Sequence, residues 1–171
     1  CDLVVAATND CLAKMRKGFS SVVINAYESP TGDNVHQPDM RFPATAMEQS
    51  IIDTVGEDHF HMVNATRLAT ALLGDSIASN MFMLGYAWQR GLIPVSETAI
   101  LGAIRLNGAA VEMNQQAFVW GRHAAVDSAR VERLAFPELE QAIQRALETT
   151  LQDIVEHRAS YLRAYQDDAY A

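Results

Sequence analysis

The stretch NATRLATALLGDSIASNMFMLGYAWQRGLIP (residues 64–94) decides the fold, because it is apolar on nearly every helical face. Apolar side chains recur in it at the helical spacings of three and four residues, at Leu68, Leu72, Leu73, Ile77, Met81, Leu84 and Trp88. The opposite side is also largely apolar, with Ala71, Ala78, Phe82, Gly85 and Tyr86. A helix that is apolar all round is buried, so we expect this stretch to form the centre of the core.

Polar residues interrupt the same stretch near its middle. Gly74 followed by Asp75 has the order of a helix C-cap and the next N-cap, which predicts two helices or one kinked helix. Ser79 and Asn80 shorten the apolar run below the roughly 20 residues of a membrane span, so no membrane span is expected. The small residues Ala78, Ser79 and Gly85 allow another backbone to approach this stretch closely.

Strands and helices alternate ahead of this stretch. The apolar runs DLVVAA (2–7), SVVINA (21–26) and HFHMVN (59–64) predict strands, and the T-x-x-E pattern from Thr45 to Glu48 predicts a capping box that opens a helix. This alternation is typical of an α/β fold with a parallel sheet and right-handed crossovers. Three strands are few for such a sheet, so we expect the chain to be a piece of a longer polypeptide.

The chain beyond residue 94 is predicted to be helical. Ser96 caps one helix, and a second over about 109–130 carries a narrow apolar seam at Ala110, Met113, Ala117, Trp120 and Ala124. After Pro137 an amphipathic pattern continues for some 30 residues. We therefore expect one domain over 1–133 and a helical arm over 134–171 that leads to the next region.

Charge and cysteine content exclude several classes of protein. The net charge of −8, without a cluster of Lys and Arg, argues against a nucleic-acid partner. The two cysteines, Cys1 and Cys11, do not have zinc-site spacing and do not imply a disulfide scaffold. No signal peptide is visible, so a cytoplasmic protein is expected.

Candidate sites are few. Thr31, Gly32 and Asp33 follow a predicted strand and form a possible ligand-facing loop, although TGD is also an ordinary turn. His59 and His61 would share one face of a strand, but a third metal ligand is not apparent, and two half-exposed histidines are the simpler interpretation. Neither a dinucleotide nor a P-loop motif occurs. The sequence predicts no catalytic, cofactor-binding or metal-ligating residue.

Two segments resemble a known family. The segments SVVINAYESPTGDNVHQPDMRFPA (21–44) and 64–127, above all LGDSIASNMFMLGYAWQRGL and VEMNQQAFVWGR, resemble the gamma domain of 2-oxoacid:ferredoxin oxidoreductases, closest to the fused bacterial indolepyruvate:ferredoxin oxidoreductase. The likeness covers about residues 1–128 and implies a Rossmann-like three-layer domain with a parallel sheet and a helix-rich C-terminal half. The glycine-rich GxGGQG turn that opens the family's domain is absent, so the chain is expected to begin inside the domain.

The resemblance implies a noncatalytic part of a thiamine-dependent enzyme that oxidatively decarboxylates a 2-oxoacid to an acyl-CoA. Thiamine diphosphate with Mg, and 4Fe–4S clusters, would be held elsewhere in the parent enzyme, with CoA as co-substrate. The expected partners are the other domains of that enzyme, ferredoxin and further copies of the chain in a homo-oligomer. Indolepyruvate, phenylpyruvate and branched-chain oxoacids stay open as substrates. The alternative is a free-standing α/β module that binds a small ligand or a protein.

Overall fold

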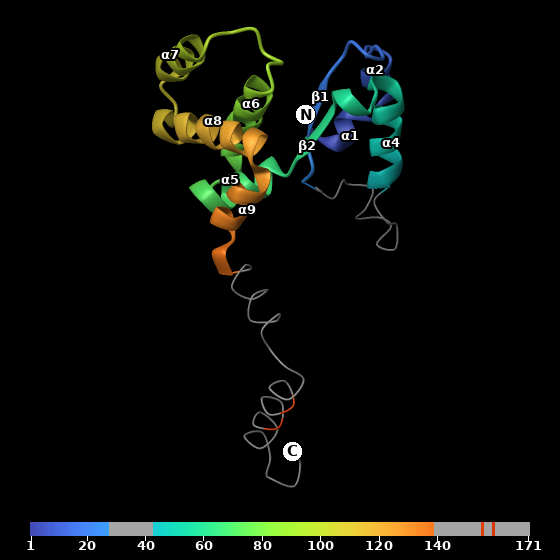
Figure 1. Cartoon of the computed structure of the whole chain (residues 1–171). Coiled ribbons are helices and arrows are strands. Elements are labelled where there is room, and N and C mark those ends of the chain that lie inside the picture. The colour runs from blue at the N-terminus through green and yellow to red at the C-terminus, as the bar shows by residue number, and fades with distance from the viewer. Residues whose placement is uncertain (28–42, 139–154, 156–158, 160–171) are drawn as a thin grey trace, which may run out of the picture. The chain divides into compact units, whose positions relative to one another are not determined.

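A computed structural model describes residues 1–27 and 43–138, together with the isolated positions Val155 and Ala159. Two strands and several helices follow one another in these ranges (Figure 1), in the order α1 (Leu3–Ala6), α2 (Asn9–Leu12), β1 (Val22–Asn25), α4 (Ala44–Val55), η1 (Glu57–His59), β2 (Phe60–Val63), α5 (Ala65–Leu73), η2 (Ser76–Ala78), α6 (Ser79–Gln89), α7 (Glu97–Asn107), α8 (Val111–Val126) and α9 (Ser128–Ala135). The chain divides into two units, Cys1–Ala135 and Phe136–Ala171.

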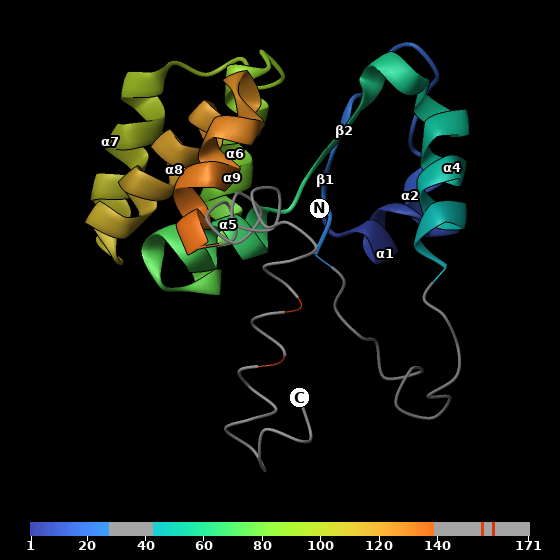
Figure 2. The same ribbon diagram turned by 60° about the horizontal axis from the view of Figure 1, so that its bottom comes forward.

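The sheet consists of β1 and β2, which run parallel and lie side by side in both ribbon views (Figure 2). Val22 pairs with Phe60 and Asn25 with Val63, which confirms the strands predicted at 21–26 and 59–64. The helical segment α4 connects the two strands, so the connection is the crossover that a parallel pair needs. The sheet and its helices confirm the α/β, Rossmann-like fold class, with a helix-rich C-terminal half.

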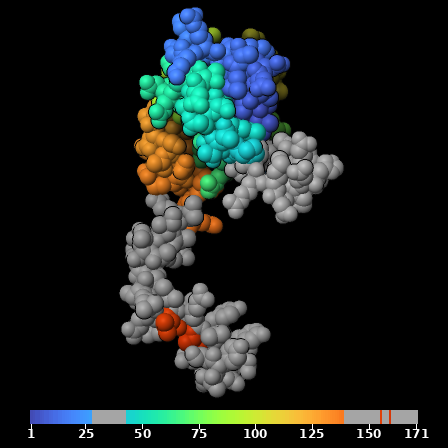
Figure 3. All heavy atoms as spheres, turned by 90° about the vertical axis from the view of Figure 1, so that its right-hand side faces the viewer, coloured from blue at the N-terminus to red at the C-terminus, as the bar shows by residue number. Residues whose placement is uncertain are grey.

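One core cluster lies on the side of the sheet that α1 and α4 cover. Alternation along β1 sends Val22 and Ile24 into this cluster, with exposed fractions of 7% and 0%. The buried partners of these two residues are Leu3, Ala6, Ile51 and Val55. In the space-filling view, the blue N-terminal residues and the cyan helix α4 lie together on one face (Figure 3). Val23 and Asn25 point to the other side of the sheet, toward α6.

The strand predicted over 2–7 is wrong. Only Asp2 keeps an extended pairing, an isolated parallel bridge to Asn25, and α1 begins at Leu3. A short apolar run fits a strand and a helix equally well, so burial decides between them. Leu3 and Ala6 are the buried positions, and their spacing of three residues is helical.

The predicted break in the central stretch is confirmed. Gly74 ends α5 in the left-handed conformation, with φ of 80°, and the side chain of Asp75 accepts a hydrogen bond from the Ile77 nitrogen at 2.9 Å. After the short 3-10 turn η2, the chain continues as α6. The side chain of Ser96 likewise caps α7, and Gly108 ends it with φ of 72°.

Helix α6 packs against α8 through a reciprocal contact of two glycines. A Cβ atom built on Gly85 would lie 2.0 Å from the Phe118 carbonyl oxygen, and one built on Gly121 would lie 1.9 Å from the Phe82 carbonyl oxygen. Such distances are impossible for real Cβ atoms, so both positions require glycine. Gly85 of α6 lies against Phe118 of α8, and Phe82 of α6 lies against Gly121 of α8. The two helices therefore run in opposite directions at the crossing. Gly85, one of the three small residues expected to allow a close approach, therefore lies at such a contact.

This crossing determines which side of α6 is buried. Phe82, Gly85 and Tyr86, on the side opposite the predicted leucine stripe, are buried between the helices. Ile77, a member of that stripe, is 71% exposed, and Leu84 is only partly buried. The backbones of α6 and α8 meet on the side of α6 that carries Gly85, and this contact encloses Phe82 and Tyr86 on the same side. Hydrophobicity alone could not distinguish these two sides.

Two helix boundaries also differ from the predictions. Helix α4 begins at Ala44 after Pro43, and no side chain caps it, so Thr45 and Glu48 lie inside the helix and form no capping box. The helix predicted over about 109–130 divides into α8 and α9 at Asp127. The Asp127 carboxylate accepts a hydrogen bond from the Arg130 nitrogen at 2.9 Å, which starts a new helix.

The predicted arm after residue 133 lies mostly outside the described residues, and so does the amphipathic pattern after Pro137. The boundary between a domain over 1–133 and an arm over 134–171 stays a prediction. Within the described parts of the chain, no helix is long and apolar enough to cross a membrane.

Replacing Gly121 by Ala should destabilise the chain by about 3 kcal/mol, because the new methyl group meets a backbone carbonyl that cannot rotate away. The melting temperature, followed by circular dichroism, should fall by roughly 6–12 °C. Gly102→Ala in α7 is the matched control, since no atom lies within 4 Å of its added Cβ. The control should melt at or above the temperature of the unmodified chain, as Ala favours a helix by about 1 kcal/mol over Gly. Equal melting temperatures for the two variants would show that the crossing is not this close.

Candidate functional site

A cavity of about 630 Å³ lies beside the carboxyl end of β1, between the sheet and α6. One part of its lining is polar and uncharged, formed by Asn25, Tyr27, Thr66, Ser76, Ser79 and Asn80. The facing part is apolar, formed by Val23, Met83, Leu84, Ala87 and Ile93. Ligands of open parallel sheets bind at the carboxyl ends of the strands, so this cavity is the candidate site that the topology favours.

Asn25 organises the polar side of the cavity and is only 5% exposed. Its amide nitrogen donates to the Thr66 hydroxyl at 2.8 Å and to the Asp2 carboxylate at 3.2 Å. Its amide oxygen accepts hydrogen bonds from the backbone nitrogens of Tyr27 and Thr66, each at 3.4 Å. The Asn25 side chain thus joins the end of β1 to Tyr27 and to Thr66 in the first turn of α5.

The chemistry of the cavity follows from this lining. Asn25 uses its hydrogen-bonding groups within the protein, so it shapes the cavity and holds its walls together. The hydroxyl and amide groups of Ser76, Ser79 and Asn80 can donate and accept hydrogen bonds. Among the described residues that line it, none is a Lys or Arg that would neutralise a phosphate, and Asp2 is the single carboxylate. The arrangement suits binding of an uncharged group better than proton transfer between paired acids and bases.

The sequence-predicted candidates are not brought together at this cavity. Thr31, Gly32 and Asp33 lie outside the described residues, so the predicted ligand-facing loop stays a prediction. His61 lies in β2, but His59 is the last residue of η1, so the two histidines do not share one face of a strand as predicted. Nδ1 of His59 is 2.9 Å from the Ser21 hydroxyl. Burial lowers the pKa of His61 below its ordinary value of 6.5, and the positive charges of Arg90 and His59 lower this pKa further.

The described residues offer no metal centre. Among them, no three His, Cys, Asp or Glu side chains are placed to hold a metal ion. A 4Fe–4S cluster needs four thiolate ligands, and the whole chain has two cysteines, so this chain by itself does not fit such a cluster. Cys1 and Cys11 are both free thiols.

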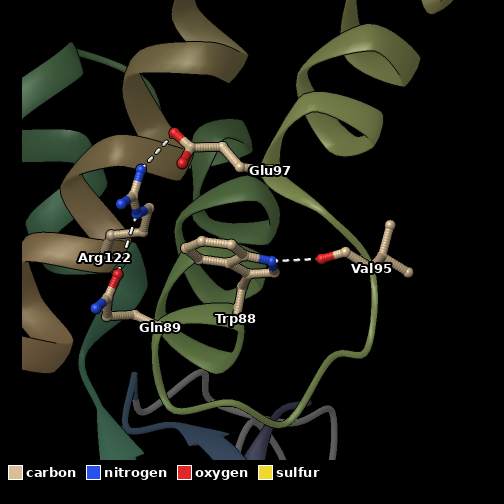
Figure 4. Close-up of polar contacts among 5 residues, drawn as sticks. All are labelled: Trp88, Gln89, Val95, Glu97 and Arg122. Atoms are coloured by element: carbon tan, nitrogen blue, oxygen red, sulfur yellow. Dashed lines mark hydrogen bonds and ion pairs between the residues drawn. The ribbon is translucent and has the colours of Figure 1, made fainter.

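A second polar cluster lies around Arg122 on α8, and its groups are used to join helices (Figure 4). The Arg122 guanidinium donates to the Glu97 carboxylate at 2.5 Å and to the Gln89 side-chain oxygen at 3.1 Å. It also lies 4.8 Å above the ring of Trp88. The indole nitrogen of Trp88 donates to the Val95 carbonyl at 2.7 Å. The cluster therefore fastens α7 and the connection before it to the α6–α8 pair.

The fold and the cavity define the class of the protein as a Rossmann-like α/β domain with a binding cavity at the carboxyl end of its parallel sheet. Residues 1–124 match the family model described as pyruvate ferredoxin/flavodoxin oxidoreductase, and the chain belongs to that family. Membership of this family supports a component of a 2-oxoacid:ferredoxin oxidoreductase. No curated protein and no solved structure matches the chain at a significant level.

Sequence reasoning missed Asn25 and the cavity beside it. The available signal was a polar residue at the end of the otherwise apolar run SVVINA, where alternation places it on the side of the sheet away from Ile24. The cavity itself had no such signal. Its lining comes from segments as distant as Val23 and Ile93, and only the packing of α6 onto the sheet brings them together.

Asn25→Ala should lower the free energy of unfolding by about 1–3 kcal/mol, because it leaves the Thr66 and Tyr27 nitrogens without this acceptor. Urea unfolding monitored by circular dichroism measures the change. Asn80→Ala is the matched control, since Asn80 lines the same cavity but is exposed. Its free energy of unfolding should stay within about 0.5 kcal/mol of the unmodified value. An equal decrease in the free energy of unfolding of both variants would contradict the role of Asn25 in joining β1 to α5.

His61 should make the chain less stable in mild acid. Since its pKa is lowered in the folded state, the unfolded chain binds more protons as the pH falls below about 6.5. The contribution of His61 is fully present above its unfolded-state pKa and is lost as the pH falls below it. His61→Asn should therefore reduce the drop in melting temperature between about pH 7.5 and about pH 5.5. An unchanged drop in His61→Asn would contradict this role of His61.

Proposed function

We propose that the chain is a noncatalytic gamma-domain portion of a thiamine-dependent, cytoplasmic 2-oxoacid:ferredoxin oxidoreductase. The match of residues 1–124 to the oxidoreductase family is the observation that carries the proposal. The cavity supports the noncatalytic role, because its polar lining consists mainly of amides and hydroxyls rather than of paired acids and bases. The Asn25 amide among them is hydrogen-bonded within the protein.

The parent enzyme would convert a 2-oxoacid and CoA to an acyl-CoA and CO₂, and the two electrons released would reduce ferredoxin. Indolepyruvate is the proposed substrate, on the strength of the sequence resemblance. Thiamine diphosphate with Mg would supply the decarboxylation chemistry and 4Fe–4S clusters the electron transfer, all held by other domains. The two cysteines of this chain support that division of labour.

The part played by this chain would be to provide architecture and contacts with the other domains. The α6–α8 crossing and the Arg122 cluster together make its helical half rigid, which suits a part that positions its neighbours. We also propose that the parent enzyme is a homo-oligomer.

The cavity favours a second candidate function, a free-standing α/β module that binds a small uncharged ligand. Its volume of about 630 Å³ lies in the range of small-molecule sites. The oxidoreductase domain and the free-standing module differ in whether the chain functions alone. A module would bind its ligand alone, whereas the domain of an oxidoreductase would act only within the assembled enzyme.

The complete oxidoreductase that carries this chain should reduce ferredoxin when a 2-oxoacid and CoA are both supplied. Initial rates with indolepyruvate, phenylpyruvate and pyruvate, followed by the absorbance of ferredoxin, give kcat/KM for each. We expect kcat/KM to be highest for indolepyruvate, by at least about tenfold over pyruvate. Preference for pyruvate would overturn the substrate, and no CoA-dependent reduction with any of the three would overturn the function.

The noncatalytic role has its own measurement in the same enzyme. Asn80→Ala should leave kcat within about threefold of the unmodified enzyme, provided that gel filtration shows the assembly intact. A fall of about a hundredfold in an intact assembly, the size expected for a lost acid or base, would contradict the role.

A further inference from the structure

The end of α7 carries the dipeptide Asn107–Gly108, the single place in the sequence where glycine follows asparagine. Glycine has no Cβ atom, so no side chain on Gly108 shields its backbone nitrogen from the side chain of the residue before it. The Cγ atom of an asparagine can reach the next backbone nitrogen and close a succinimide ring with it. The dipeptide therefore favours an attack of the Gly108 nitrogen on the Asn107 side-chain amide.

The structure leaves this end of α7 uncovered. Ile104 is the last buried residue of α7, and every residue from 105 to 110 is exposed. Within the described parts of the chain, no hydrogen bond holds the Asn107 side-chain amide. Helix ends fray, and a turn that packs against nothing opens at a low free energy. The last turn of α7 can therefore open without disturbing the core around Ile100, Ile104 and Phe118.

The backbone nitrogen of Gly108 is also weakly held. It donates a hydrogen bond to the Arg105 carbonyl at 3.2 Å, which is at the long end of the range for such bonds. Gly108 has the left-handed conformation, with φ of 72°, so the α-helical hydrogen-bond pattern stops at this residue. Opening of the bond to Arg105 frees the nitrogen, and rotation of the exposed Asn107 backbone brings the nitrogen to Cγ.

We propose that Asn107 is a site of spontaneous deamidation and isoaspartate formation in the folded chain. The Gly108 nitrogen loses its proton and bonds to Asn107 Cγ, the Cγ–Nδ2 bond breaks, and ammonia leaves, so a succinimide forms. Water then opens the ring. Cleavage between this nitrogen and Cγ gives aspartate, whereas cleavage between the nitrogen and the main-chain carbonyl carbon gives isoaspartate. Water is the one added reactant, and nothing is oxidised or reduced.

Both products change the end of α7. A neutral amide becomes a carboxylate at the C-terminal end of a helix, where the helix dipole is already negative. Isoaspartate also lengthens the backbone ahead of Gly108 and displaces the left-handed residue that ends the helix. The last turn of α7 should loosen, while the Glu97–Arg122 ion pair at its first turn stays in place. The modification is independent of the proposed function, because it needs only these two residues and water.

Peptide mapping by mass spectrometry tests the proposal on the full chain, kept folded for several days in warm, mildly alkaline buffer. Asn80 is the matched internal control, since it is also exposed but is followed by Met81 within α6. Deamidation at Asn107 should exceed that at Asn80 by at least about tenfold. Isoaspartyl methyltransferase should label the peptide that holds Asn107. Equal conversion at the two positions, or conversion at Asn107 only after unfolding in urea, would overturn the proposal.

A variant separates the ring closure from other damage. Asn107→Gln lengthens the side chain by a methylene, so the ring is larger and conversion at this position should fall at least about tenfold. During the same incubation, the melting temperature of the unmodified chain should fall by about 1–4 °C. The melting temperature of Asn107→Gln should stay constant. An equal fall in the variant would place the damage elsewhere and would contradict the effect on α7.

Discussion

The contact between Gly85 and Gly121 is the constraint on which the helical half of the domain depends. Each helix presents the pattern Phe-x-x-Gly, FMLG in α6 and FVWG in α8, and each glycine lies against the backbone of the other helix's phenylalanine. Close approach of the backbones encloses Phe82 and Phe118, which are both 0% exposed. Any side chain at either glycine would separate the helices and open the space around both rings.

Other features of this half follow from that crossing. Trp88 packs at 5.8 Å on Phe118, and the Arg122 guanidinium covers Trp88 while it binds Glu97, so α7 is tied to the same pair. With one side of α8 enclosed, its other side carries Val119 and Val126, which are 38% and 74% exposed. With one side of α6 enclosed, Leu84 and its neighbours face the sheet and form the apolar wall of the cavity.

Membership of the oxidoreductase family and the form of the cavity fit together physically. A parallel sheet collects the carboxyl ends of its strands at one edge, and Asn25 closes that edge by joining β1 to α5. The lining of the cavity, mostly hydroxyls, amides and apolar side chains with the Asp2 carboxylate, differs from the glycine-rich, phosphate-binding turn that many Rossmann-like domains present at this position. The domain thus keeps the parallel-sheet architecture of a nucleotide-binding fold, while the described residues that line this cavity include neither Lys nor Arg to recognise a phosphate.

The sequence alone determined the local features that depend on neighbouring residues. These include the parallel strands around Val22 and Phe60, the break at Gly74 and Asp75, and the cap at Ser96. Only the tertiary structure decided which side of an apolar helix is buried, that 3–6 is helical, and that Asn25 and α6 enclose one cavity. The physical reason is that hydrophobicity and capping are properties of nearby residues, whereas burial, and with it the cavity, depends on which distant backbones can approach each other.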